Sequence, residues 1–257
     1  MTGDDLVSRE TPAAPERARR VFPLERLALA EAYADWLAGP GTVRGLIGPR
    51  ELPRLWERHL LNCAVLAEVI PQGATVCDLG SGAGLPGLVL AITRPDLRIT
   101  LVEPLLRRSS FLGEVAAALK LPAVEVVRGR ADELHGRRSF DVVTSRALAP
   151  LDRLLPWSMP LVAPSGSLLA IKGSSLAAEI RAAESQLARW HCAEPVVLHL
   201  GEGVVLPTTT AVRVAWADPG KVGWPLLPGT SSAPDGPDVV DGREEPDPGR
   251  PPSDGAG

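Results

Sequence analysis

The segment that most constrains this chain is glycine-rich: Asp78-Leu79-Gly80-Ser81-Gly82-Ala83-Gly84-Leu85-Pro86-Gly87. It follows an apolar run, Ala74–Leu79, and precedes another apolar segment, so it predicts a tight turn from a strand into a helix. Glycine permits such a turn and lets a ligand approach the backbone without meeting a Cβ atom. The N–H groups at the start of the helix suit the negative end of a ligand. This unit is typical of α/β proteins.

Strands and helices alternate along the rest of the chain, which predicts a mostly parallel sheet. The strands we expect are Ala74–Leu79, Arg98–Glu103, Val124–Arg128, Phe140–Thr144, Ser167–Lys172, Val196–Leu200 and Ala211–Trp216. Helices are expected over Pro104–Leu119, Leu151–Leu161 and Ser174–Trp190. Only ten residues separate the last two strands, too few for a long crossover helix, so they predict an antiparallel hairpin. We therefore expect a seven-stranded Rossmann-like α/β fold.

Two further helices precede this domain. Leu24 to Leu37 has helical apolar spacing, and Gly39-Pro40-Gly41 is expected to stop the helix. A second helix is expected from Pro53 to Ile70. The sequence thus predicts a loose arm over 1–21, a helical cap over 22–72, the Rossmann-like domain over 73–217 and a disordered tail over 218–257.

The tail differs in composition from the rest of the chain. Of its 40 residues, 17 are Pro or Gly, and it holds 3 basic and 8 acidic side chains. Such a segment cannot bury a core. The remaining residues carry 24 basic and 23 acidic side chains, so the body is close to neutral.

Composition and spacing also argue against some classes of protein. No run of about 18 uncharged apolar residues is present, and the first ten residues lack the pattern of a secretory signal, so we expect a cytoplasmic protein. Three cysteines and four histidines are scattered without the spacing of a metal site. We therefore expect no metal and no membrane association.

The glycine segment fits two ligand patterns. In the frame Gly82-x-Gly84-x-x-Gly87, typical of dinucleotide binding, the first glycine falls four residues beyond Asp78, too far past the strand for the usual turn. In the frame Gly80-x-Gly82-x-Gly84 the turn begins sooner and Asp78 supplies an acid for a cationic ligand. The second frame favours S-adenosylmethionine over NAD.

Glu103 ends the second expected strand, where an acid accepts hydrogen bonds from both hydroxyls of a ribose. This supports an adenosine ligand without choosing among adenosine cofactors. The alternative is that Glu103 only caps the helix that begins near Pro104.

Several further blocks accompany the glycine segment. They are Arg58-His59-Leu60-Leu61-Asn62, the stretch DLGSGAGLPGL over 78–88, Leu101-Val102-Glu103-Pro104, Arg130-Ala131-Asp132-Glu133, the stretch FDVVTSRA over 140–147 and Leu169-Ala170-Ile171-Lys172-Gly173. Together, over about Leu24 to Trp216, they resemble the RsmG (GidB) family of 16S ribosomal RNA guanine-N7 methyltransferases. The GLPG, SRA and KG blocks in combination are more specific than any one of them.

The resemblance implies a class I S-adenosylmethionine-dependent methyltransferase whose substrate is a guanine in the 530 loop of 16S rRNA, free or in the assembled 30S subunit. The donor-binding residues it implies are Gly80, Gly82, Leu85, Glu103, Ala131, Asp132 and Arg146, and the frame of the glycine loop adds Asp78 and Gly84. The catalytic residues it implies are Arg146, Arg58 and His59. We expect the protein to be a monomer.

The chain departs from the family pattern at two places. Asp132 stands where the family more often has Glu, and the neighbouring Glu133 blurs the register. Asn62-Cys63 stands where Asp-Ser is more usual. The alternative interpretations are a surface or ion-pair role for Arg146 and a half-buried structural role for His59.

Two interpretations also apply to several other basic residues. Lys172 at a strand end is interpreted either as part of the site or as facing solvent. The pairs Arg107-Arg108 and Arg137-Arg138 are either solvated or lie near RNA phosphates. N7 of neutral guanine carries no proton, so the reaction needs alignment rather than a general base, and Arg146 or Arg58 would hydrogen-bond O6 of the base.

Three rival functions stay open at this point. An NAD(P)-dependent oxidoreductase shares the glycine loop, but the only tyrosine, Tyr33, forms no Tyr-x-x-x-Lys pair. A non-catalytic RNA-binding module is opposed by the 4% aromatic content. A methyltransferase acting on another RNA or on a small molecule shares the fold, and only the blocks outside the glycine loop argue against it.

Overall fold

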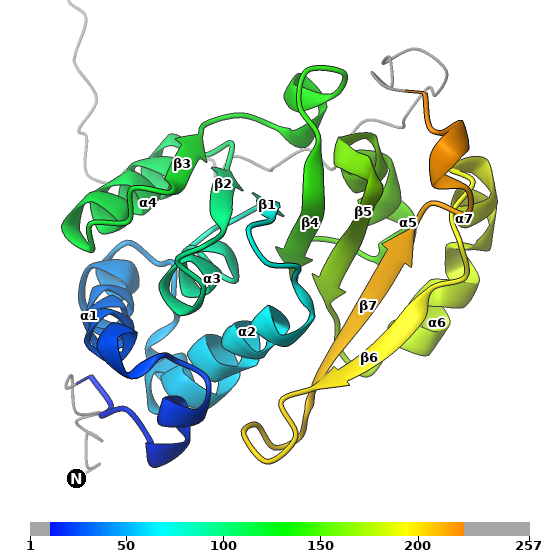
Figure 1. The fold of residues 1–257 in the computed structure, drawn as a ribbon. Coiled ribbons are helices and arrows are strands. Elements are labelled where there is room, and N and C mark those ends of the chain that lie inside the picture. The colour runs from blue at the N-terminus through cyan, green and yellow to red at the C-terminus, as the bar shows by residue number, and fades with distance from the viewer. Residues whose placement is uncertain (1–10, 224–257) are drawn as a thin grey trace, which may run out of the picture.

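A computed structural model describes residues 11–223, and within them one seven-stranded sheet crosses the molecule (Figure 1). The strands lie in the order β3-β2-β1-β4-β5-β7-β6. Their bounds are β1 (Thr75–Leu79), β2 (Arg98–Val102), β3 (Val124–Val127), β4 (Phe140–Arg146), β5 (Val162–Ile171), β6 (Val196–Leu200) and β7 (Thr209–Ala215). β1 to β5 are parallel, and β7 is antiparallel to both of its neighbours. The predicted Rossmann-like fold with a terminal hairpin is confirmed.

Helices cover both faces of this sheet. The α-helices are α1 (Leu27–Trp36), α2 (Asn62–Ala64), α3 (Gly87–Thr93), α4 (Leu106–Ala118), α5 (Leu151–Ser158), α6 (Leu176–Ala182) and α7 (Glu184–Arg189). Shorter or wider helical turns are η1 (Glu16–Arg20), η2 (Leu24–Arg26), η3 (Leu37–Gly41), η4 (Pro49–Arg54), η5 (Leu55–Leu61), η6 (Val65–Val69), η7 (Ala131–Leu134), η8 (Met159–Leu161) and η9 (Pro219–Lys221).

The two faces of the sheet belong to two apolar cores because successive strand residues point in opposite directions. Val142 and Leu169 pack with the N-terminal helices, α3 and α4, whereas Val143 and Leu168 pack with α5, α6 and α7. The resulting helix–sheet–helix layers follow from the continuously apolar strands, which can be buried on both sides. Figure 1 shows α1 to α4 around the β1–β3 half of the sheet and α5 to α7 near β5 to β7.

The N-terminal helices differ from the sequence prediction. Gly39-Pro40-Gly41 does not stop the first helix, because the chain passes through these residues as the wide turn η3 and continues to Val43. The wider turn accommodates Pro40, which cannot donate an N–H to a regular helix. The second helical segment begins at Pro49 rather than Pro53 and reaches Val69 as η4, η5, α2 and η6.

The prediction of a loose arm over 1–21 is wrong for its last residues. Glu16–Arg20 form η1, Ala18 is fully buried, and Arg17 makes an ion pair with Glu57. Residues 1–10, and residues 224–257 of the predicted tail, lie outside the described part of the chain.

Two other elements differ in extent from the sequence prediction. β5 begins at Val162, five residues before the predicted start at Ser167. The expected helix over 174–190 is interrupted at Ala183, between α6 and α7.

Strand order reverses between β1 and β4, which are direct neighbours although β2 and β3 lie between them in sequence. In open parallel sheets, ligands bind outside the carboxyl ends of the strands at such a switch point. Here the glycine-rich loop follows β1, and Arg146 ends β4. The topology therefore brings the two most informative sequence blocks to one place.

Candidate functional site

The glycine-rich loop makes a sharp turn after β1. Gly80, Gly82 and Gly84 have φ angles of +65°, +55° and +98°, a region that side chains disfavour. The N–H groups of Gly80 and Ser81 donate to the carbonyl of Val102 on β2, at 2.9 and 3.2 Å. The loop is therefore held against the end of the neighbouring strand.

Asp78 is fully buried beneath this loop. Its Oδ2 accepts a hydrogen bond of 3.0 Å from the N–H of Gly87, the first residue of α3. A Cβ atom at Gly87 would lie 2.7 Å from that oxygen and would also collide with Leu101. This helix start is thus already occupied by a carboxylate, which corrects the expectation that its N–H groups are free for a negatively charged ligand.

The second oxygen of Asp78, Oδ1, is buried and has no hydrogen-bond partner among the described residues. Burial raises the pKa of the Asp78 carboxyl to about 7, although its hydrogen bonds and the charge of Arg146 act to lower it. A buried, unpaired carboxylate oxygen is costly unless a ligand supplies a donor or a positive charge.

Glu103 follows β2 directly and is only 2% exposed. Its Oε2 accepts from the N–H of Gly82 at 3.0 Å, and its Oε1 accepts from the N–H of Leu105 at 3.1 Å. The carboxylate thus joins the glycine-rich loop to the start of α4. The expected cap is present, and the same group also lies at the predicted ligand loop.

Tyr33 on α1 also supports the loop, and sequence reasoning did not identify it as part of the site. Its side chain is fully buried, and its hydroxyl donates a hydrogen bond of 2.7 Å to the carbonyl of Ala83. Burial holds its pKa well above the ordinary value, so the hydroxyl stays protonated. The signal available in the sequence was a single tyrosine on an apolar helix face, which carries no ligand information.

Arg146 projects from the end of β4 to the N-terminal helices. Its Nη1 donates to the backbone carbonyl of Arg58 at 2.9 Å and approaches the sulfur of Cys63 at 3.8 Å. Its Nη2 lies 2.6 Å from Nδ1 of His59. The structure therefore brings Arg146 together with Arg58 and His59, the other two residues proposed as catalytic, which lie 88 and 87 positions away in sequence.

His59 is only 6% exposed and is neutral near pH 7. Burial and the nearby Arg146 charge lower its pKa to about 4, against the opposing effect of Glu51. Its Nε2 lies 3.0 Å from Oε2 of Glu51. Both ring nitrogens are thus engaged, and Glu51 is a second residue that sequence reasoning did not identify.

Arg58 contributes differently from the other two. Its side chain is 59% exposed and lies 3.4 Å from Oε2 of Glu51, whereas its carbonyl holds Arg146. The neighbouring departures from the family pattern also have structural partners: Nδ2 of Asn62 donates to Oγ1 of Thr209 at 2.8 Å, and buried Cys63 lies beside Arg146.

The residues expected near an adenine lie on η7. Ala131 is partly buried and packs against the apolar core that lies between the sheet and α5, whereas Asp132 is exposed. Glu133 accepts a hydrogen bond of 2.7 Å from the N–H of Arg130 and thereby caps this short helix. The cap gives Glu133 a structural partner, and so favours Asp132 as the ligand-facing acid of the two.

Lys172 does not face solvent. Its side chain is 8% exposed and donates to the carbonyl of Ala149 at 2.6 Å and to Oε2 of Glu179 at 2.8 Å. It therefore anchors the loop that follows Arg146. Arg138 precedes β4, at the opposite end of that strand from Arg146, and pairs with Glu125 at 2.8 Å. Arg107 and Arg108 lie exposed in the first turn of α4.

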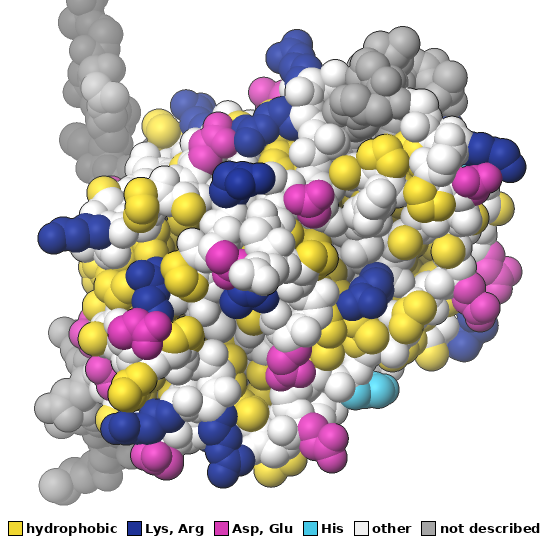
Figure 2. Space-filling model, in the orientation of Figure 1, with side chains coloured by type: hydrophobic (Ala, Val, Ile, Leu, Met, Phe, Trp, Pro, Cys, Tyr) yellow, Lys and Arg dark blue, Asp and Glu magenta, His cyan; other side chains and the backbone are white. Residues whose placement is uncertain are grey.

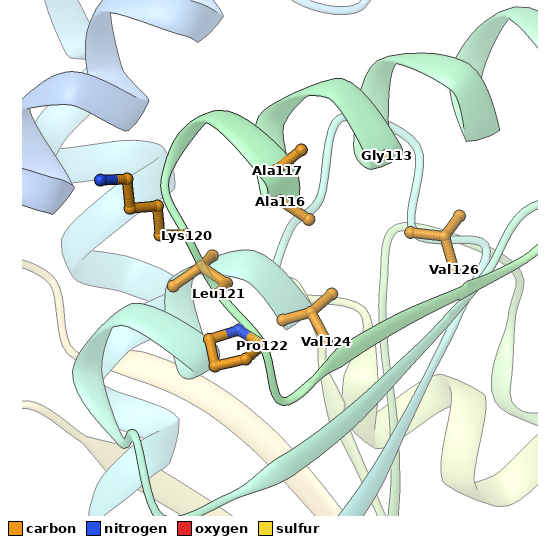
Figure 3. Close-up of a pocket in the computed structure, with 8 residues that line it drawn as sticks. All are labelled: Gly113, Ala116, Ala117, Lys120, Leu121, Pro122, Val124 and Val126. Carbon is orange, nitrogen blue, oxygen red and sulfur yellow. The ribbon is translucent and has the colours of Figure 1, made fainter.

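An apolar groove lies elsewhere, between α4 and the edge strand β3 (Figure 3). Its lining residues are Gly113, Ala116, Ala117, Lys120, Leu121, Pro122, Val124 and Val126. Lys120 is the one charged side chain in this lining, and the groove contains no member of the cluster around Arg146. We therefore locate the candidate site at the switch point rather than in this groove.

Among residues 11–223, no group of three or more His, Cys, Asp or Glu side chains is arranged to hold a metal ion. No helix in this range is long and apolar enough to cross a membrane.

A family model described as rRNA small subunit methyltransferase G (GidB) matches residues 26–203. The chain belongs to this family. A ribosomal RNA small subunit methyltransferase G from Nocardioides sp. is 68% identical over 226 residues, which cover 88% of this chain and 90% of the relative. The Streptomyces coelicolor relative is 58% identical over 80% of this chain and 86% of its own length. The Corynebacterium glutamicum relative is 49% identical over 78% and 91%.

Membership in the rRNA small subunit methyltransferase G family confirms the resemblance seen in the sequence. The protein is a Rossmann-like methyltransferase whose substrate is small-subunit ribosomal RNA. The match spans the glycine-rich loop, Glu103, η7, Arg146 and Lys172, together with α2 and the elements around it. The clustered side chains described above therefore lie within the family's shared region.

Proposed function

We propose that this protein transfers the methyl group of S-adenosylmethionine to N7 of a guanine in the 530 loop of 16S rRNA. The observation that carries the proposal is that the glycine-rich loop and Arg146 both lie at the switch point of the sheet. Both ring nitrogens of the neighbouring His59 are already engaged, so this histidine has no nitrogen free to accept a proton. A site of this kind can align a donor and a base without removing a proton.

The donor would bind at the loop after β1. The loop backbone at Gly80, Gly82, Gly84 and Leu85 would contact the donor. The ribose of the donor would bind Glu103, and its adenine would lie by Ala131 and Asp132. Asp78 suits a ligand that carries positive charge, because its buried Oδ1 lacks a partner. When bound, the donor supplies an activated methyl group.

The guanine would lie beside Arg146. Guanidinium N–H groups hydrogen-bond the O6 edge of guanine, and this contact would orient N7 toward the methyl carbon of the donor. Because Arg146 is held by the Arg58 carbonyl and by His59, its direction is fixed before the substrate arrives. The exposed Arg58 side chain would contact the RNA backbone or the base.

No residue needs to act as a general base. N7 of neutral guanine has an available lone pair, so the reaction releases no proton from that atom. In neutral His59, Nδ1 already accepts from Arg146 and Nε2 faces Glu51. The ring therefore has no acceptor left for a proton, which supports a positioning role for it.

The substrate would be structured rRNA, free or in the 30S particle, bound by a monomer in the cytoplasm. Basic and acidic side chains are interspersed on the face shown in Figure 2 rather than gathered by sign. Binding to extended naked RNA depends mainly on phosphate neutralisation. A mixed surface supports recognition of a shaped target whose guanine is already unstacked.

The decisive experiment maps N7-methylguanine in 16S rRNA from cells with and without this protein. We expect one guanine of the 530 loop to lose its methyl group and to regain it when the wild-type chain is restored. A complete modification pattern in its absence would refute the assignment. Purified protein given free 16S rRNA or 30S particles then distinguishes the two forms of substrate.

An oxidoreductase fits the same loop less well. In a dinucleotide site the pyrophosphate meets free N–H groups at a helix start, but here the N–H of Gly87 is bound to the Asp78 carboxylate. Thermal-shift assays with NAD and with S-adenosylhomocysteine separate the two, and we expect stabilisation only by the latter.

A further inference from the structure

Glu51 lies on η4 and contacts two members of the cluster around Arg146. Its Oε2 is 3.0 Å from Nε2 of His59 and 3.4 Å from Nε of Arg58. Its side chain is 30% exposed, whereas that of His59 is 7% exposed. Glu51 therefore reaches from the surface to a buried ring that in turn contacts Arg146.

The hydrogen-bond pattern determines the proton position on His59. An arginine side chain only donates, so Nδ1 of His59 must accept from Nη2 of Arg146. The neutral ring then carries its proton on Nε2, where it donates to the Glu51 carboxylate. The opposite tautomer would direct an N–H of His59 at an N–H of Arg146.

We propose that Glu51 is a positioning residue that selects this tautomer and thereby directs Arg146. The inference rests on the proposed role of Arg146 in binding the guanine. Glu51 touches neither donor nor base; it acts through His59. Its fixed acceptor gives the Nε2–H form an advantage, so the Nδ1 lone pair stays available to the guanidinium.

Removing the acceptor should release this constraint. In Glu51→Ala the ring gains access to the Nδ1–H tautomer, and that form cannot accept from Arg146. In Glu51→Gln an amide oxygen can still accept from Nε2–H, although the charge is lost. Rescue by Gln therefore separates a hydrogen-bond acceptor from a simple counter-charge for Arg58.

The experiment uses the full-length chain and two readouts. Nitrogen-15 NMR reports the tautomer of His59, with its signal identified by its loss in His59→Gln. Methyl transfer to the RNA substrate gives kcat and KM, and calorimetry gives the Kd of S-adenosylhomocysteine. Glu114→Ala is the matched control, because Glu114 is also part-exposed and pairs with Arg44 at 2.6 Å.

We expect wild-type His59 to carry its proton on Nε2. Glu51→Ala should populate the other tautomer and lower kcat about tenfold or more with the donor Kd unchanged, because small misplacements of a positioned group are costly. Glu51→Gln and Glu114→Ala should stay within about twofold of wild type.

Three results would overturn the inference. They are an Nδ1–H or charged His59 in the wild-type protein, a Glu51→Ala variant with unchanged kcat, and a Glu51→Gln variant as impaired as Glu51→Ala. The wild-type NMR result needs no variant to fold. Wild-type activity on rRNA in the same assay tests the proposed function separately, since it stands whichever tautomer is found.

Discussion

Nη2 of Arg146 lies 2.6 Å from Nδ1 of His59, and the two residues are 87 positions apart in the sequence. The contact joins the end of β4 to η5, so the N-terminal helices are part of the site. It also explains why a neutral histidine is suited to this position: in a charged imidazolium, Nδ1 would carry a proton that points at an N–H group of Arg146.

Replacing Arg146 with Ala should lower methyl transfer by about a hundredfold or more, because a small misplacement of the reacting base is costly. The melting temperature should change little, because the group is part-exposed and water can replace it. Arg138→Ala is the control, since this arginine lies at the other end of β4 and pairs with Glu125. Equal activity of the two variants would remove Arg146 from the reaction.

Donor binding should strengthen as pH rises through about 7. Burial raises the pKa of Asp78 to about 7 in the free protein, so below that pH the carboxyl is protonated and lacks the charge that a cationic donor favours. The affinity should rise by about tenfold between about pH 6 and about pH 8 and then level off. Calorimetry in buffers of different ionisation enthalpy measures the accompanying proton release.

The same group affects the free protein in the opposite direction. Because the folded pKa of Asp78 lies above its ordinary value, its contribution to stability is present at low pH and is lost as pH rises to about 7. Asp78→Asn should abolish both trends. A pH-dependent affinity that persists in this variant would assign the titration to another group.

Gly87→Ala should destabilise the fold by about 1–3 kcal/mol, because the added Cβ meets Leu101 and the Asp78 carboxylate. Gly113→Ala is the matched control: Gly113 lies within α4 and a Cβ there meets nothing within 4 Å. That variant should gain about 0.5–1 kcal/mol from helix propensity. Urea unfolding measures both, and opposite signs are expected.

Tyr33→Phe should cost about 1–2 kcal/mol and weaken donor binding several-fold, since it leaves the Ala83 carbonyl of the glycine-rich loop unpaired. Ser158→Ala removes a comparable buried hydroxyl, bonded to the Leu154 carbonyl at 2.8 Å in α5. It should cost similar stability and leave donor affinity unchanged. Equal donor affinity in both variants would show that Tyr33 acts on folding alone.

The sequence predicted the parallel core well because strands buried on both faces leave continuous apolar runs, as at Val142 and Val143. It predicted the glycine-rich loop because the turn requires particular residues. It misplaced the end of the first helix, because helix-stopping chemistry at Pro40 was offset by a wider turn within tertiary packing. Local propensity is a weak guide where packing decides.

Sequence motifs pointed to the residues of the candidate site that lie in conspicuous blocks, but not to the residues that hold them in place. Glu51 and Tyr33 act through partners 8 and 50 positions away, and nothing in their own neighbourhood marks them. The sequence could not decide between a site role and a solvent-facing role for Lys172, because it does not show that Lys172 is buried and paired with Glu179. Partners of this kind are determined by three-dimensional packing rather than by spacing.

Glu103 already accepts one backbone hydrogen bond on each of its two oxygens. Since each carboxylate oxygen accommodates two donors, a pair of neighbouring hydroxyls can be bound while the existing bonds persist. The acid is therefore oriented in advance, and little conformational entropy is lost at this residue when a nucleoside arrives.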